Sequence, residues 1–133
     1  WQPVARIDGA FWSNLFPHGT NLYLLGTDRH HGNVVIRRSG DGGVTWTEPT
    51  DATHGLLRPD GEYHGAPVPV LVHAGRLWRG MERRDPPEGW GVHYQAGVLS
   101  VPLDADLLDA SKWTFATFLA SNTNGTTAIW GVA

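Results

Sequence analysis

The chain has 133 residues, room for one ordinary domain, and its 41% hydrophobic and 17% charged residues are typical of a soluble globular protein rather than a disordered one. A net charge of −3 leaves no excess of basic residues to neutralise phosphates, so we expect no nucleic-acid partner. No apolar run approaches the roughly 18 residues of a membrane span, and we expect no membrane partner. The absence of cysteine excludes disulfides and thiolate metal sites and leaves the compartment open.

Short strands dominate the predicted secondary structure. Apolar runs predict strands at 21–26, 33–37, 67–73, 76–81 and 92–101. Turn residues separate them at 19–20, 40–43, 60–61 and 74–75. Helix chemistry is confined to residues 104–112, which are long enough for one or two turns. Strands this short and this regularly spaced favour a sandwich, a barrel or a propeller.

An internal repeat selects the propeller. Residues 11–27 align with 63–82, because each segment has an aromatic start, a Pro-containing run, a Gly turn and a second aromatic-bearing strand. Trp1, Trp46 and Trp113 fall in phase with the repeat, at separations of 45 and 67 residues, and we expect each to mark a fourth strand. A period near 45 with four strands per unit is typical of propeller blades.

The predicted fold is therefore all-β, a β-propeller segment of about two four-stranded blades. Its single domain divides into a blade unit at 1–45, a second at 46–112 and a fourth-strand remnant at 113–133.

One motif is unusually specific. Ser39, Asp41, Gly43, Thr45 and Trp46 match all five fixed positions of the Asp-box pattern S-x-D-x-G-x-T-W. In this spacing the carboxylate can accept backbone N–H bonds across a tight turn, and the glycine permits a positive φ. The tryptophan is expected to pack beneath the turn, so the motif indicates a structural role.

On these residues the chain resembles the Asp-box, or BNR-repeat, sialidase-like β-propellers, and is most similar to sialidase-like glycoside hydrolases of environmental bacteria. Ser100, Asp104 and Trp113 resemble a degenerate second box. The resemblance implies that the box lies on the outer rim, away from the ligand. It also implies a bacterial protein, with a periplasmic or secreted location slightly favoured over the cytoplasm.

The sequence departs from true sialidases at their Arg-Ile-Pro segment. Arg6 and Ile7 are followed by Asp8 rather than proline, and no arginine triad is apparent. Glu62 and Tyr63 adjoin, whereas the sialidase Tyr–Glu pair is defined by its geometry.

Propellers bind ligands at one end of the central tunnel, which here predicts a site built from residues 11–14, 63–65, 27–31 and 82–90. The predicted catalytic residues are Asp28, Glu82, His30 and His64. Asp28 and Glu82 end apolar strands and are preferred over the other loop carboxylates, Asp85 and Glu88, as the acid and the base or nucleophile of a glycosidase. The predicted substrate-binding residues are Trp12, Asn14, Arg29, Tyr63, Arg83 and Trp90.

We expect no cofactor, although a divalent metal held by histidines is a lesser alternative. The histidines concerned are His30, His31, His64 and His93. Three functions follow: a sialidase-like glycoside hydrolase or its remnant, a non-catalytic glycan-binding propeller, or a metal-dependent phosphate or lactone ester hydrolase. The first is favoured, with carbohydrate as the partner.

A second expected partner is another copy of the chain. Two blades cannot close a ring, because propellers have about four to eight. The phase of the chain, from one fourth-strand tryptophan to another, favours head-to-tail assembly. Three copies would give six blades, and two copies are the second choice. The alternative is that these residues belong to a longer single-chain propeller.

Overall fold

The computed structural model describes residues 1–65, 68–84 and 94–120. Its strands all belong to one antiparallel-paired sheet with the order β1-β2-β3-β4-β6-β7-β8, in which β5 pairs with β6 and β9 pairs with β7. The strands are β1 (Phe11–His18), β2 (Asn21–Thr27), β3 (Gly32–Ser39), β4 (Leu56–His64), β5 (Leu71–His73), β6 (Arg76–Arg83), β7 (Gln95–Pro102), β8 (Thr114–Phe115) and β9 (Leu119–Ala120). None of the described segments forms a helix long and apolar enough to cross a membrane.

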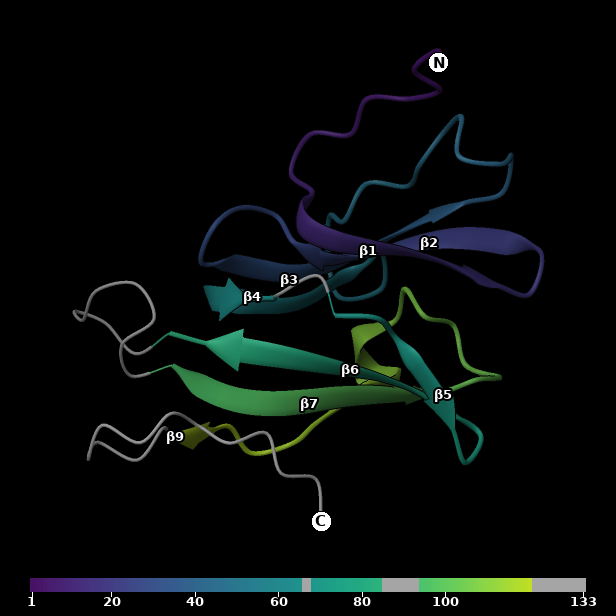
Figure 1. Ribbon diagram of the computed structural model, residues 1–133. Coiled ribbons are helices and arrows are strands. Elements are labelled where there is room, and N and C mark those ends of the chain that lie inside the picture. Colours follow the sequence, from purple (N-terminus) through teal and green to yellow (C-terminus); the bar gives the residue numbers. More distant parts are fainter. Residues whose placement is uncertain (66–67, 85–93, 121–133) are drawn as a thin grey trace.

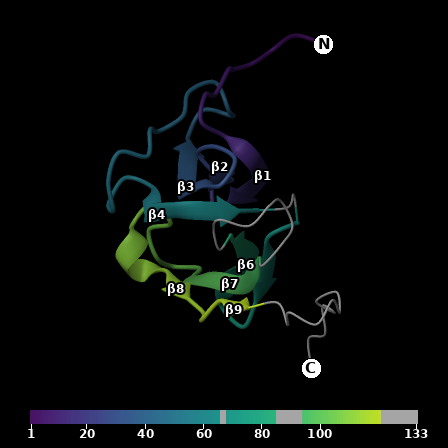
Figure 2. The ribbon, with the colours of Figure 1, turned by 90° about the vertical axis from the view of Figure 1, so that its left-hand side faces the viewer.

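The sheet folds into two layers (Figures 1 and 2), because β4 passes from one to the other. Leu56 at its start pairs with Val35 in β3, whereas Tyr63 near its end pairs with Arg83 in β6. Between these ends the chain bends at Gly61 and Glu62, with φ of 68° and 63°. The first layer is β1, β2, β3 and the start of β4; the second is the end of β4 with β5 to β9. This is the expected all-β arrangement of propeller-like blades.

The hydrophobic core lies between the two layers. Alternate residues of each strand point inward, so Leu25 and Ile36 of the first layer and Leu77 and Leu99 of the second are almost completely buried. The segment between β7 and β8 adds Leu107, Leu108 and Trp113 to this core. Two sheets packed through such inner faces form the usual core of an antiparallel protein.

Four of the five predicted strands are confirmed in their described residues, with shifts of at most a few positions. The fifth, at 67–73, is strand only from Leu71 to His73. Residues 104–112 form turns and a single 3-10 turn, Ala110–Lys112, rather than a longer helix.

The prediction that Trp46 starts a fourth strand is wrong. Trp46 lies in an irregular segment, and the fourth strand of the first layer begins at Leu56. Asp51 explains the delay: its carboxylate accepts hydrogen bonds from the backbone N and hydroxyl of Thr53, at 2.8 and 2.7 Å, which holds a turn ahead of the strand. The unit boundaries at residues 45 and 112 stay predictions.

The turn after β3 has the local geometry expected of the Asp box. Asp41 accepts hydrogen bonds from the backbone N and the hydroxyl of Thr45, at 2.9 and 2.6 Å, and from the hydroxyl of Ser39 at 2.8 Å. Gly43, at a φ of 95°, accepts a 2.9 Å bond from the indole Nε1 of Trp46. These bonds are local to one turn, so the motif acts on stability rather than on a ligand.

The Asp box should contribute stability that depends on pH. The hydrogen bonds from Thr45, and then that from Ser39, lower the pKa of Asp41 from 3.8 to about 2. The folded state therefore favours the ionised carboxylate, and this contribution is complete above about pH 4 and lost as the pH falls to about 2. Asp41→Asn should lower the melting temperature at pH 7 by roughly 5 °C, and the difference from the wild type should shrink at pH 2.

Thermal melts followed by circular dichroism between pH 2 and pH 7 test this. Asp104→Asn, at an exposed aspartate, is the matched control and should leave the melting temperature unchanged. A gap between Asp41→Asn and the wild type that is independent of pH would contradict the role assigned to the carboxylate.

Candidate functional site

The strand pairings bring four separate segments to one end of the molecule. Phe11 at the start of β1 pairs with Thr27 at the end of β2, so the loop 28–31 leaves from beside the first strand. His64 at the end of β4 pairs with Glu82 near the end of β6. The end where these segments meet is opposite to the Asp-box turn, since β3 runs from the one to the other. We call it the mouth.

A histidine–glutamate pair lies in the mouth. His64 is 4% exposed, and its Nδ1 is 3.2 Å from Oε2 of Glu82. An ionised carboxylate can only accept, so Nδ1 of His64 donates and its Nε2 carries the lone pair when the ring is neutral. The Glu82 side chain is partly exposed, so one partner of the pair reaches solvent. This arrangement orients a base and holds a carboxylate where a ligand can meet it.

Aromatic rings surround the pair. Trp12 is 45% exposed, and its ring centroid is 5.2 Å from that of His64 and 5.9 Å from that of Phe11. Phe11 lies in turn 5.3 Å from His30. An exposed tryptophan face beside buried polar groups is a surface on which a sugar ring can stack.

A second histidine is fixed by its neighbours. The guanidinium Nη1 of Arg84 is 3.1 Å from Nδ1 of His31, and the other ring nitrogen of His31 contacts the hydroxyl of Tyr94. Arginine has no acceptor, so Nδ1 must hold a lone pair and the proton lies on Nε2. Burial, then the nearby His30, Arg84 and His64, lowers the pKa of His31, which agrees with a neutral ring.

Backbone conformation is unusual at the same place. Among the residues that the structure describes, four non-glycine residues have a positive φ, and three of them, Trp12 (44°), His31 (52°) and Glu62 (63°), belong to the mouth. Trp12 lies in a β-bulge of β1 opposite Gly26 of β2. A Cβ atom at position 26 would lie 2.2 Å from Oγ of Ser13, so only glycine fits opposite the bulge. Such conformations are costly and gather where function requires a fixed geometry.

Hydrogen bonds hold these strained residues. The backbone N of Glu62 donates to the carbonyl of His31 at 3.2 Å, and the backbone N of Arg84 donates to the carbonyl of Glu62 at 2.8 Å. The side chains of Glu62 and Arg84 add an ion pair at 3.9 Å. The loop 28–31 and the ends of β4 and β6 are thereby tied into one unit.

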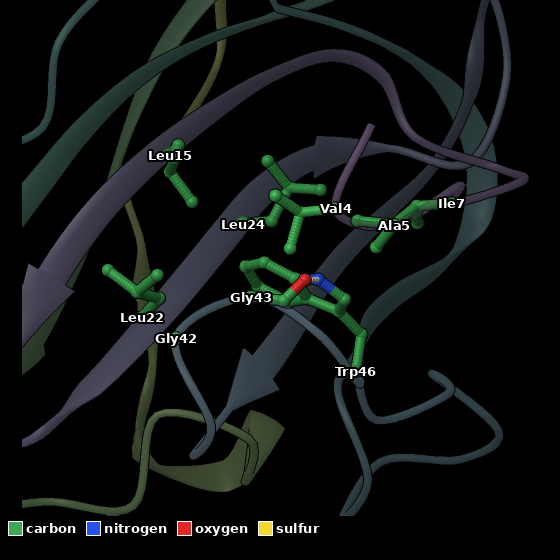
Figure 3. A pocket seen from close by; sticks show the side chains of 9 residues that line it. All are labelled: Val4, Ala5, Ile7, Leu15, Leu22, Leu24, Gly42, Gly43 and Trp46. Atoms are coloured by element: carbon green, nitrogen blue, oxygen red, sulfur yellow. Dashed lines mark hydrogen bonds between the residues drawn. The ribbon is translucent and has the colours of Figure 1, made fainter. Parts of the chain in front are cut away.

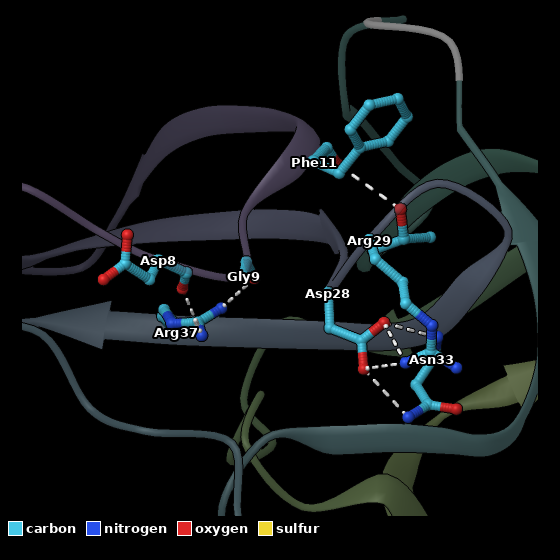
Figure 4. Close-up of polar contacts among 8 residues, drawn as sticks. Asp8, Gly9, Phe11, Asp28, Arg29, Asn33 and Arg37 are labelled. Atoms are coloured by element: carbon cyan, nitrogen blue, oxygen red, sulfur yellow. Dashed lines mark hydrogen bonds and ion pairs between the residues drawn. The ribbon is translucent and has the colours of Figure 1, made fainter.

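Asp28 is used by its own loop. Its carboxylate accepts 2.9 Å bonds from the backbone N and the side-chain amide of Asn33, and it is paired with Arg29 at 3.1 Å (Figure 4). These contacts close the turn between β2 and β3, and the ion pair with Asp28 holds the exposed side chain of Arg29 on this turn. The catalytic role of Asp28 and the binding role of Arg29 stay predictions.

The prediction that Tyr63 stacks on a sugar is contradicted by its burial. Tyr63 is fully buried in the core, where its hydroxyl donates to Asp60 at 3.2 Å and its ring lies 5.7 Å from that of Phe118. Successive residues of a strand face opposite sides. Tyr63 therefore points into the core while its neighbour His64 points to the mouth. Arg83 lies over the Tyr63 ring, 6.0 Å from its centroid.

Asn14 links the two layers. The guanidinium of the buried Arg79 in β6 donates to the side-chain oxygen of Asn14 in β1 and to the carbonyl of Val68. Burial lowers the pKa of Arg79 to about 10. Asn14 therefore has a structural contact beside the site, and substrate binding by it stays a prediction.

Several predicted residues lie outside the described ones: Trp90, Asp85, Glu88 and His93. Within residues 1–65, 68–84 and 94–120, no group of three or more histidine and carboxylate side chains is arranged to hold a metal ion. The histidines of the mouth contact rings and hydrogen-bond partners instead.

The predicted segment 82–90 contains Arg84, but neither Arg84 nor Glu62 nor Tyr94 was singled out from the sequence as a site residue. Tyr94 directly precedes β7, and the hairpin register that pairs Arg83 with Gln95 brings it to the mouth. Pairing the predicted strands at 76–81 and 92–101 as a hairpin would have placed Tyr94 beside the end of β6. The adjacency of Glu62 and Tyr63 in the sequence does not place Glu62 at the site, because its position depends on the bend in β4.

Comparison with known proteins supports the fold. The sequence matches no protein-family model and no curated protein. Among solved structures, the chain is similar to an alpha-L-arabinofuranosidase from Lactobacillus brevis, with a TM-score of 0.50 and 19% identity over 80% of this chain. The chain spans about a third, 34%, of the length of that enzyme. At this identity the likeness shows the fold alone, and a sialidase family is not supported by any match.

The neutral state of His31 is testable by titration. Arg84→Gln removes the positive charge that lies beside Nδ1 of His31, so the pKa of His31 should rise. It should stay below 6.5, because burial is the largest cause of its lowering. Two-dimensional NMR of the histidine ring protons between pH 4 and pH 8 measures this. Arg83→Gln, which changes the adjacent arginine, is the matched control and should leave the titration of His31 unchanged.

Proposed function

We propose that the chain contributes the active-site end of a glycoside hydrolase that acts on a terminal sugar. The observation that carries this is the pairing of the buried His64 with the partly exposed Glu82 beside the exposed Trp12. A sugar needs a flat apolar surface for its ring face and a carboxyl group at its glycosidic oxygen or anomeric carbon. The mouth holds both within one cluster.

Glu82 is the proposed reacting carboxyl group. Glycoside hydrolysis breaks the bond between the anomeric carbon and the leaving oxygen; one carboxyl group protonates that oxygen and a second activates water or attacks the carbon. The Nδ1–H of His64 donates to Glu82 at 3.2 Å and fixes the orientation of its carboxyl group, which suits a base or nucleophile. His64 thus acts on the sugar through Glu82.

Two residues of the mouth are candidates for the second carboxyl group. Asp28 ends β2 but accepts bonds from its own loop, whereas Glu62 lies at the bend of β4 and pairs with Arg84. His30, with its ring 5.5 Å from that of His64, is proposed to bind sugar hydroxyls.

Similarity to an alpha-L-arabinofuranosidase is consistent with this proposal through the fold that the two share. A glycan-binding protein without catalysis is the second candidate. It is favoured by the aromatic surface of Phe11 and Trp12, which would bind a sugar with or without Glu82.

Glu82→Gln separates the two candidates. After a screen of chromogenic glycosides has identified a substrate, this variant should lower kcat by at least about 10²-fold, the scale of a lost acid–base group. KM should change little, since the amide keeps the shape of the side chain. The melting temperature of each variant is the control for folding, and Asp41→Asn, at the far end of β3, should keep the kcat of its folded fraction.

Trp12→Ala should have the opposite kinetic signature. Loss of a stacking surface of about 1 kcal/mol weakens sugar binding roughly fivefold, so KM should rise while kcat is retained. Sugar binding by calorimetry with no hydrolysis of any glycoside tested would support the glycan-binding candidate. Neither binding nor hydrolysis would overturn both.

A further inference from the structure

The two layers are built on the same plan, which allows their residues to be matched. The hairpins turn at equivalent places, after the pair His18–Asn21 in the first layer and after the pair His73–Arg76 in the second. Counting from these turns, the second strands β2 and β6 match position by position. The matched pairs are Leu22 with Leu77, Tyr23 with Trp78, Leu24 with Arg79, and Leu25 with Gly80.

The two layers use opposite faces of this shared plan. In the first layer Phe16, Tyr23 and Ile36 are buried against the second layer. Their equivalents in the second layer, Leu71, Trp78 and Val98, lie on its outer face, where Leu71 is 62% and Val98 41% exposed. The second layer thus repeats, uncovered, the face that the first layer buries.

The reverse holds for the first layer. The second layer buries Leu77 and Leu99 against the first. Leu22, the equivalent of Leu77, lies instead on the outer face of the first layer together with Leu24 and Leu15, of which Leu15 is 61% exposed. Each layer therefore has one face that packs on the other layer and one outer face with exposed apolar side chains, and residues 4–9 lie along part of the outer face of the first layer.

The outer face of the first layer is also hollowed. An apolar groove of about 340 Å³ lies between this face, Ile7 of the N-terminal segment and Trp46 of the Asp-box turn (Figure 3). Arg37 anchors that segment by donating to the carbonyls of Gly9 and Asp8, at 2.8 and 3.0 Å (Figure 4). The groove and the exposed Leu15 leave this face with apolar surface for a partner to cover.

We propose that the outer face of the second layer of one copy packs on the outer face of the first layer of another copy. The contact would repeat, between chains, the packing that already joins the two layers within the chain, because each outer face is equivalent to a face of that internal interface. The argument is independent of the proposed glycosidase activity.

Such a contact is heterologous, since two different patches meet, and it closes only as a ring. Three copies give the six-bladed ring that we expect, with three mouths at the same end. The predicted particle has three times the 14.5 kDa mass of the chain.

Light scattering coupled to size exclusion tests the assembly and the faces. Leu71→Glu should convert the assembly to monomers, because it places a charge on the outer face. Val72→Glu is the matched control: Val72 is the next residue of β5, is 59% exposed and points to the opposite side of the strand. It should leave the mass unchanged, and Val98→Glu should act like Leu71→Glu.

A wild-type chain that is monomeric at 100 µM would overturn the proposal, and another polypeptide would then be the partner of these faces. An assembly that withstands both Leu71→Glu and Val98→Glu while these variants stay folded would overturn it as well.

Cross-linking tests the head-to-tail arrangement. The chain has no cysteine, so Leu15→Cys and Val98→Cys each introduce a single reactive group on one of the two faces. When a tagged sample of the first variant is mixed with an untagged sample of the second, a short bismaleimide should join mainly tagged to untagged chains. Predominant tagged-to-tagged dimers would mean that like faces meet and would contradict the proposed contact.

Discussion

The packing of the two layers against each other is the constraint on which the rest of the structure depends. Neither layer has a core of its own, because a sheet of three or four strands buries residues only against another element. Leu25 and Ile36 are buried by the second layer, as Leu77 and Leu99 are by the first. The continuous strand β4 makes this packing local in the chain, since it leaves one layer and enters the other within nine residues.

The position of the site follows from that passage. β4 changes layers through the bend at Gly61 and Glu62, and the residues that follow it are divided between core and mouth. Tyr63 turns inward and anchors the second layer, while His64 turns outward and meets Glu82. A bend that is needed to build the core thus delivers a polar residue to the mouth, and the strained backbone is stabilised by the same packing that requires it.

Each of the two faces that meet between the layers has an equivalent outer face on the other layer. These outer faces link the fold to its proposed assembly. Within the chain, Arg79 and Asn14 add a polar contact beside the apolar core, so the inner interface is selective as well as hydrophobic. On the outer face of the first layer the residue matched to Arg79 is Leu24, which lines the apolar groove. The outer contact is therefore expected to be more apolar than the inner one.

By itself the sequence determined the class of the fold, most of the strands and the Asp-box turn, because these depend on interactions between residues close in the chain. The alternation in β2 and β6 and the spacing from Ser39 to Trp46 are of this kind. Tertiary structure alone decided the mouth. Whether Tyr63 or His64 faces the ligand depends on the bend and register of β4, and the contact of His31 with Arg84 joins residues 53 positions apart. A one-residue change of register exchanges the two faces of a strand, and no local pattern determines it.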